Sequence, residues 1–216
     1  MPNGPEINFH NRRGDSLHFL TEIGGDGHRL WAGTMSIRIA FLGHSTVLLQ
    51  SGSLSVLTDP VFSGRVFGLK RHSPSSIWPA DYPDPSAILV SHAHYDHLDI
   101  SSFSSISGNV PVIVPEGIEG ALSHLITNPI FALTPFATHH LPDGSEVTAL
   151  PVRHLGGRLI PLRYRATCAF MIRTKGRSVF FCGDSAYGEH FRNIGELTPP
   201  DLALLPIGNG FPRFWA

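Results

Sequence analysis

One hexapeptide, His-Ala-His-Tyr-Asp-His at positions 92–97, constrains the fold of this chain more than any other segment. It follows an apolar run at residues 87–90 that is bounded upstream by prolines, and such a run predicts a buried strand. In an extended backbone His92 and His94 project to the same side. Two imidazoles on one side suit a borderline cation such as zinc. The hexapeptide therefore predicts a metal site at the end of a buried strand.

The other two donors of the hexapeptide, Asp96 and His97, lie just past the strand and can face a second cation or the water of the first. A histidine-rich surface loop without metal is the alternative, and the dense spacing of donors after a buried strand argues against it. One hexapeptide cannot complete the coordination of two ions, so further ligands must come from later in the chain.

The composition is that of an ordered globular protein. Of the 216 residues, 42% are hydrophobic and 15% are charged, which suffices for a sizeable core. The net charge of −1, without a lysine or arginine stripe, predicts no nucleic-acid partner. No apolar run is long enough to span a membrane and the N-terminus lacks an apolar signal core, so we expect a cytoplasmic protein. Cys168 and Cys182 fall within apolar runs and are expected to be buried, reduced thiols.

The pattern of apolar runs predicts an α/β sandwich in which two sheets face each other and helices lie outside. Residues 1–34 show little periodicity and are expected to be a partly ordered lead segment before a single domain at 35–216. Three runs separated by glycine- or serine-containing turns predict an antiparallel meander, at 37–42, 46–50 and 54–58. Further strands are predicted at 110–115, 146–152, 166–172, 178–182 and 202–208, and helices at 101–107 and 116–127. His139 and His140 are placed in a surface loop that precedes a hairpin turn.

Two later strand ends carry further metal-binding candidates. His154 and Asp184 each follow an apolar strand directly, as the hexapeptide does. His154 would complete a three-histidine site with the first two histidines of the hexapeptide and leave a position for water. Asp184 would bridge this ion and a second ion held by the last two donors of the hexapeptide. Taken alone, an aspartate after a glycine at this position is an ordinary turn residue.

Two polar residues nearer the N-terminus are candidates for supporting these ligands. Asp59 closes the third strand of the meander; it is an expected turn residue that can also accept an imidazole N–H and fix the tautomer. His44 follows the first strand directly and can contribute in the same way, and a purely structural histidine is the equal alternative.

Together these segments resemble the metallo-β-lactamase superfamily. The hexapeptide is similar to its signature, and six segments occur in the order found in one branch of it, at 41–49, 57–63, 91–99, 154–158, 183–185 and 205–208. That branch resembles the N-acyl-phosphatidylethanolamine-hydrolysing phospholipase D family, with the ascorbate-6-phosphate lactonase group close by. The resemblance extends from residue 37 to the C-terminus. It implies a four-layer αββα sandwich that binds one or two zinc ions, with manganese or iron as alternatives.

The chain departs from this branch at its C-terminal end. Members of the branch continue past Pro-Ile-Gly with a segment that supplies a last histidine to the second metal, whereas this sequence ends at Ala216. We therefore expect a C-terminally incomplete domain, a weaker second site with three protein ligands, and an open sheet edge that a homo-oligomer would cover. His190 is a less favoured substitute for the histidine, because it is expected on a helix.

The resemblance implies a metal-dependent hydrolase in which a metal-bound hydroxide attacks a small-molecule or lipid-like phosphodiester, or an ester. Asp96 would orient the nucleophile, and Arg158 would stabilise the charge that develops on the substrate. One alternative is a lactonase for a small sugar or sugar-phosphate lactone. Others are a catalytically impaired metal-binding protein without the last histidine, and a fragment that does not fold alone. The metal-binding residues do not distinguish phosphodiester from lactone.

Overall fold

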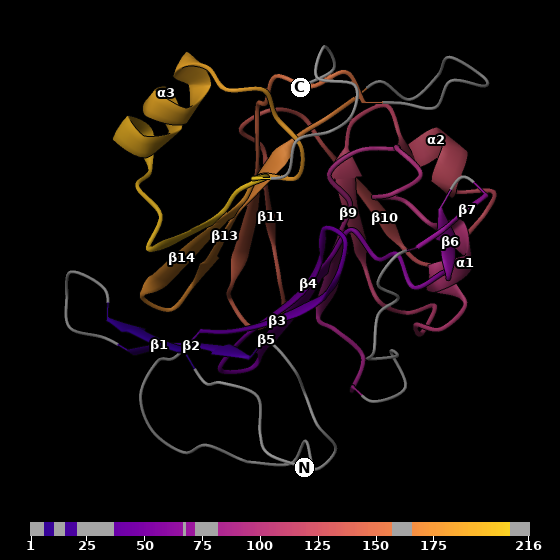
Figure 1. Cartoon of the computed structure of the whole chain (residues 1–216), viewed down its shortest axis with the longest axis horizontal. Helices are drawn as coiled ribbons and strands as arrows, with labels where there is room; N and C mark the ends of the chain where they lie inside the picture. The colour runs from indigo at the N-terminus through magenta and orange to yellow at the C-terminus, as the bar shows by residue number, and fades with distance from the viewer. Residues whose placement is uncertain are drawn as a thin grey trace.

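The computed structural model describes residues 7–10, 16–20, 37–66, 68–71, 82–156 and 166–207, with backbone only for the first two ranges and for residue 121. Two β-sheets pack face to face, with helices outside them (Figure 1). The larger sheet runs in the order β1 (Ile7–His10), β2 (Ser16–Leu20), β3 (Arg38–Gly43), β4 (Thr46–Ser51), β5 (Leu54–Thr58), β8 (Ala87–Leu89), β9 (Val112–Pro115) and β10 (Ile130–Leu133). The smaller sheet runs β11 (Thr138–His140), β12 (Glu146–Leu150), β13 (Ala169–Thr174), β14 (Arg177–Phe181) and β15 (Leu202–Leu204). A small ribbon, β6 (Arg65–Val66) with β7 (Leu69–Lys70), lies apart from both.

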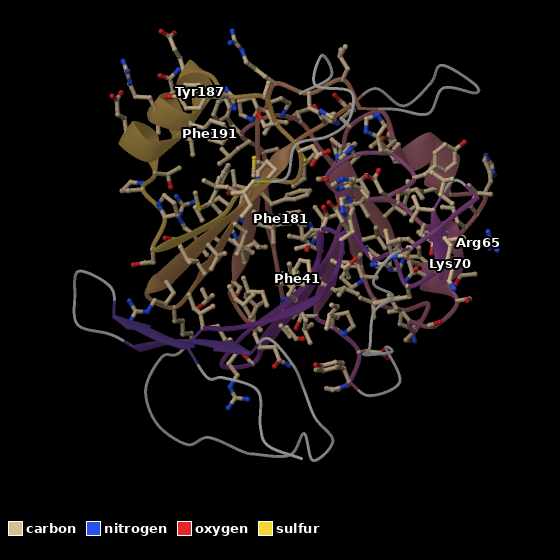
Figure 2. The ribbon with its side chains drawn as sticks, viewed as in Figure 1. Phe41, Arg65, Lys70, Phe181, Tyr187 and Phe191 are labelled. Carbon is tan, nitrogen blue, oxygen red and sulfur yellow. The ribbon has the colours of Figure 1, made fainter. Side chains whose placement is uncertain are left out.

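The two-residue period of the strands divides their apolar side chains between the inside and the outside of the sandwich. In β4, Val47 and Leu49 point into the space between the sheets, and Leu48 between them in sequence points to the outer face. In β13, Phe170 points inward and Met171 outward in the same way. Phe181 also belongs to this central layer (Figure 2). The central strands of both sheets are therefore buried on two faces, which explains why they read as continuous apolar runs.

The outer faces are covered by short helices. α1 (Ile100–Phe103) and α2 (Glu119–Leu122) pack on the larger sheet, where Phe103 and Leu122 are buried. α3 (Glu189–Leu197) packs on the smaller sheet through Phe191 and Ile194, on the opposite side of the molecule (Figure 1). This arrangement confirms the predicted αββα sandwich. No helix among the described residues combines the length and apolar character that crossing a bilayer requires.

Several local predictions differ from the structure. The strands β1, β2 and β10 were not predicted, and the assignment of His139 and His140 to a loop was wrong, because they lie in β11 and pair with β12. The helices predicted at 101–107 and 116–127 are single turns, α1 and α2. Glycine and serine are weak helix formers, and one turn suffices to bury the apolar residues of each segment. The predicted meander of β3, β4 and β5 is confirmed.

Five strands that precede the candidate residues have their carboxyl ends at one rim of the sandwich. In the larger sheet β3 and β5 are both antiparallel to β4, and β8 is parallel to β5, so all three end at the same edge. In the smaller sheet β12 and β14 are both antiparallel to β13. An isolated bridge between His92 and Thr167 joins the two sheets at this rim, beside a 3.0 Å hydrogen bond from Cys168 N to Ser91 O. Residues that follow these strands are thereby brought together.

Candidate metal centre

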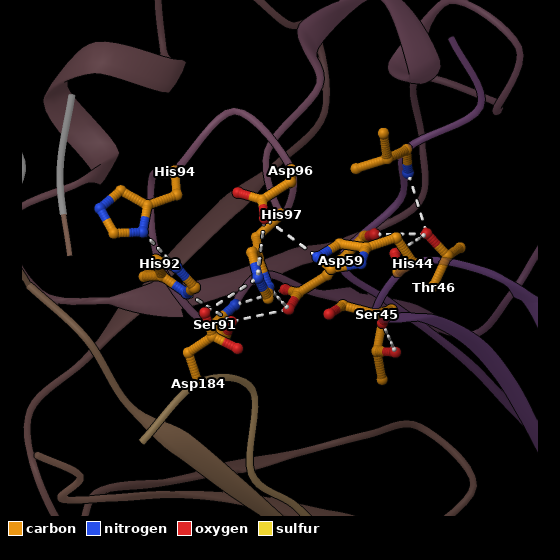
Figure 3. Close-up of polar contacts among 12 residues, drawn as sticks. His44, Ser45, Thr46, Asp59, Ser91, His92, His94, Asp96, His97 and Asp184 are labelled. Atoms are coloured by element: carbon orange, nitrogen blue, oxygen red, sulfur yellow. Dashed lines mark hydrogen bonds and ion pairs between the residues drawn. The ribbon is translucent and has the colours of Figure 1, made fainter. Parts of the chain in front are cut away.

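Every predicted ligand and supporting residue follows one of these five strands. His44 follows β3, Asp59 follows β5, the hexapeptide follows β8, His154 follows β12 and Asp184 follows β14. Figure 3 shows most of these side chains gathered at the rim. Arg158 lies outside the described residues, so its predicted role remains a prediction.

The first group of donor atoms, the three-histidine group, comprises His92, His94, His154 and Asp184. His94 Nδ1 lies 2.9 Å from His92 Nε2 and 3.2 Å from His154 Nε2, and Asp184 Oδ2 lies 3.8 Å from His154 Nε2. Ligands about 2.0–2.1 Å from a tetrahedral zinc ion would be separated by ~3.3 Å, close to these distances. Three ring nitrogens that face one another at such separations do not have enough protons for each to make a hydrogen bond. One cation, in contrast, can accept a lone pair from all three.

The second group, the rim group, comprises His44, Asp96 and His97, whose donor atoms lie within 4.8 Å of one another. Asp184 lies between the two groups, because its Oδ2 is 3.4 Å from His97 Nε2 as well as near His154. His97 is fully buried, and among the described residues its Nε2 has no partner with hydrogen-bond geometry, only the carboxylate of Asp184 at 3.4 Å. A buried polar atom without a partner is costly, so this nitrogen fits a metal ligand better than a structural group.

Burial keeps the three imidazoles of the three-histidine group neutral. Removal from water lowers the pKa of His92 well below its ordinary value, and burial also lowers the pKa values of His94 and His154. Neutral imidazoles keep the lone pair that a cation needs, and they need not lose a proton first. The described residues of this group therefore fit zinc, manganese or iron.

In the rim group, the pKa values of His97 and Asp96 are shifted in the directions that favour their charged forms. Burial acts to lower the pKa of His97, but its contacts with Asp184 and Asp59 outweigh burial and raise the pKa to about 10. Burial acts to raise the pKa of Asp96, but the hydrogen bond from His44 and the charge of His97 outweigh it and lower the pKa below its ordinary value. A cation at this position would replace the His97 proton between two carboxylates.

One buried carboxylate fixes the orientation of two ligand imidazoles. Asp59 accepts hydrogen bonds from Ser91 N, Ser91 Oγ and His97 Nδ1, each at 2.7 Å. Because the Ser91 hydroxyl donates its proton to Asp59, its oxygen accepts from His92 Nδ1 at 2.9 Å. Both imidazoles therefore keep a proton on Nδ1 and direct Nε2 to the metal positions, where a cation would displace the second proton of His97. This role of Ser91 was not predicted from the sequence, in which the only signal is a hydroxyl residue directly before the hexapeptide.

Replacing Ser91 by alanine is expected to affect the two groups of ligands differently. His92 loses its Nδ1 partner, whereas His97 keeps Asp59. We expect the affinity of the three-histidine group for zinc to fall about 10–100-fold, the usual effect of losing a residue that orients a ligand. Stepwise calorimetric titration of the chelator-treated protein measures this. An unchanged affinity would show that the hydroxyl does not orient His92.

Gly183, directly before Asp184, packs closely against Ser91. Its backbone has φ of +60°, and a Cβ at this position would lie 2.6 Å from both Cβ and Oγ of Ser91. Gly183→Ala should therefore combine backbone strain with a steric clash and destabilise the protein by ~2 kcal/mol or more. Gly52→Ala is the matched control, because its φ is +58° and nothing lies near its Cβ position. If urea denaturation gave equal losses in the free energy of unfolding for the two variants, the clash would be excluded.

Other candidate histidines lie away from both groups. His190 is in α3, where its Nε2 contacts Ser185 Oγ at 2.9 Å, and it belongs to neither donor group. His140 lies in β11, 3.4 Å from Glu146, with an exposed side chain. Within the described part of the chain, the rim is thus supplied by the hexapeptide, His44, Asp59, His154 and Asp184.

Comparison with known proteins agrees with the fold. A family model described as a β-lactamase superfamily domain matches residues 55–213. The chain belongs to the metallo-β-lactamase superfamily. The chain spans about half the length of several of the curated relatives that it matches.

Two relatives are similar to this chain in sequence, and one solved structure is similar to it in fold. It is 32% identical over 197 residues to the N-acyl-phosphatidylethanolamine-hydrolyzing phospholipase D 1 of Caenorhabditis elegans, covering 81% of this chain and 54% of the relative. It is also 32% identical over 180 residues to a metal-dependent hydrolase of Pyrobaculum calidifontis, covering 81% and 73%. The isothiocyanate hydrolase from Delia radicum gut bacteria shares the fold, with a TM-score of 0.66 at 16% identity over 82% of this chain and 74% of that one.

Proposed function

We propose that this chain is a metal-dependent hydrolase that cleaves a phosphodiester or ester bond with the help of two cations. The observation that carries the proposal is the convergence of the three-histidine group and the rim group, with Asp184 between them. Paired cations of this kind bind and activate both the attacking and the leaving oxygen of a displacement reaction. The match to the metal-dependent hydrolase of Pyrobaculum calidifontis supports the class of reaction.

The side chains at the rim have distinct proposed roles. A zinc, manganese or iron ion, when bound, would act as a Lewis acid and bring the pKa of a water ligand near neutrality. Asp96 is anionic and partly exposed, so it can accept a hydrogen bond from the attacking water and orient it. Buried Asp59 and Ser91 keep the imidazoles of His97 and His92 rigid. Rigid ligands reduce the reorganisation needed during the reaction.

The substrate remains the part of the proposal that experiment must decide. The relationship to a phospholipase D that hydrolyses an N-acyl-phosphatidylethanolamine supports a phosphodiester. A lactone or other ester would be attacked by the same residues at the rim, so the metal-binding geometry does not discriminate between them. Arg158 remains the predicted group for stabilising charge on the substrate.

A substrate panel tests the proposal. The chelator-treated protein is reloaded with zinc, manganese or iron(II), and hydrolysis of bis(4-nitrophenyl) phosphate, an aliphatic γ-lactone and a thioester is measured. We expect metal-dependent turnover of at least one substrate, with the phosphodiester as the favoured one. Metal bound at two ions per chain without turnover of any of the three would contradict the hydrolase proposal and favour a metal-binding protein.

A further inference from the structure

The rim group contains a histidine that the family pattern does not name as a ligand. We propose that His44 is a direct protein ligand of the second cation, beside Asp96 and His97; this inference rests on the proposed function. The sequence predicted only a supporting role for His44, and it predicted three protein ligands for the second cation. With His44, and with Asp184 shared between the two groups, the second cation has four protein donors: two imidazole nitrogens and two carboxylates. Such a mixed set suits zinc, manganese or iron.

The distances within the rim group support direct ligation. His44 Nε2 lies 3.0 Å from Asp96 Oδ2, which is 3.9 Å from His97 Nε2. Ligands of one ion bound at about 2.1 Å are ~3.0–3.4 Å apart when they are neighbours, so only small rotations are needed. The side chains of His44 and Asp96 are 56% and 41% exposed, whereas that of His97 is fully buried. The two exposed donors are therefore less confined by packing than the buried one and have room to adjust toward it.

The buried nitrogen of His97 is an independent sign of a ligand at this position. The ring is completely shielded from solvent, its Nδ1 is held by Asp59, and within the part of the chain that the structure describes its Nε2 makes no hydrogen bond. Because Asp59 fixes the ring, Nε2 must point toward the space that Asp96 and His44 border. The T-shaped contact between the rings of His44 and His97, with centroids 5.5 Å apart, places His44 at the open side of that space.

The turn that carries His44 is held in a strained conformation. Ser45 has φ of +51°, which is uncommon for a residue other than glycine. Thr58 Oγ1 donates to Ser45 O and Thr46 Oγ1 donates to His44 O, both at 3.1 Å. Such strain persists only where surrounding contacts enforce it, and it is concentrated at functional sites. The turn therefore fixes the backbone of His44, while its ring reaches Asp96.

The rival explanation is that His44 only orients Asp96 through its hydrogen bond. Two substitutions separate these roles. His44→Ala removes both the ligand and the hydrogen bond. His44→Gln retains an N–H donor that can reach Asp96, but its neutral amide is a poor ligand for a transition metal compared with imidazole. His140→Ala is the matched control, since His140 is also an exposed histidine near a carboxylate.

Stepwise cobalt titration of the chelator-treated protein, followed by calorimetry and the visible spectrum of the bound ion, tests the proposal. We expect two binding phases in the wild type and the His140→Ala variant. In both His44 variants the second phase should weaken by more than about 100-fold, beyond the 10–100-fold typical of a lost orienting residue. X-ray absorption should show fewer imidazole ligands for the cobalt of the His44→Ala variant.

Two outcomes would overturn the role of His44. If His44→Gln keeps the second phase within about tenfold of the wild type, the histidine orients Asp96 and does not bind the ion. If the wild type binds one ion only, no second cation exists for His44 to ligate. The proposed hydrolase can fail separately: two intact binding phases that both His44 variants weaken, without hydrolysis of any panel substrate, would retain His44 as a ligand and refute the activity.

Discussion

The His154→Ala variant is expected to lose the cation of the three-histidine group and, with it, hydrolytic turnover. His154 Nε2 lies 3.2 Å from His94 Nδ1 and 3.8 Å from Asp184 Oδ2, so it contributes one of the three converging imidazoles. Removing it leaves two nitrogens and one carboxylate. We expect zinc affinity at this group to fall by more than about 100-fold, a larger effect than losing a residue that merely orients a ligand.

His124→Ala provides the control for this experiment, because His124 is exposed and belongs to neither donor group. Zinc per chain, measured after gel filtration, and turnover of bis(4-nitrophenyl) phosphate report the two effects. If His154→Ala retains the zinc content and turnover of the control, then residues after β12 and β8 do not share an ion, and the proposed mechanism is wrong.

The Asp59→Asn variant should show the largest loss of stability among the changes considered. Asp59 and His97 form a fully buried ion pair at 2.7 Å. In either orientation the NH2 of an asparagine amide would face a donor, Ser91 N in one and Ser91 Oγ with His97 Nδ1 in the other. We expect the free energy of unfolding of the metal-free protein to fall by ~3 kcal/mol. This is the lower end for breaking a buried pair, because Asp184 still lies 3.4 Å from His97.

Urea denaturation of the chelator-treated protein measures this loss. Asp84→Asn is a suitable control, since Asp84 is exposed and its replacement should change stability by less than about 0.5 kcal/mol. In nitrogen-15 NMR, His97 of the Asp59→Asn variant should move its proton toward Nε2, away from the tautomer that binds metal. A loss below about 1 kcal/mol would mean that the Asp59–His97 pair contributes little net stability.

Local chemistry alone sufficed to predict much of the fold. The meander of β3 to β5 and the strand before the hexapeptide were predictable because each is a short apolar run between turn residues, and that pattern depends only on neighbouring residues. The strand β10 and the segment at His139 and His140 have weaker patterns. They form strands because they pair with β9 and β12, which supply hydrogen bonds that the local sequence does not specify.

In the candidate site, too, some contacts follow from the local sequence and others depend on the packing of the sheets. His92 and His94 share a side of one extended segment, so their pairing follows from the period of a strand. The approach of His154 to within 3.2 Å of His94 depends on β12 and β8 ending at the same rim, which is a property of two packed sheets. The link from Asp59 through Ser91 to His92 depends equally on β5 and β8 being neighbours.

The sequence by itself indicated the candidate donors, because the spacing of histidines and carboxylates after apolar strands reflects ligand chemistry and strand periodicity, which are local properties. It also predicted a shared role for Asp184 and a supporting role for Asp59. Only the tertiary structure showed how these segments meet: it placed Ser91 between Asp59 and His92, and it brought His44 next to Asp96. These relations arise from packing between segments distant in sequence, and such packing depends on the whole sandwich.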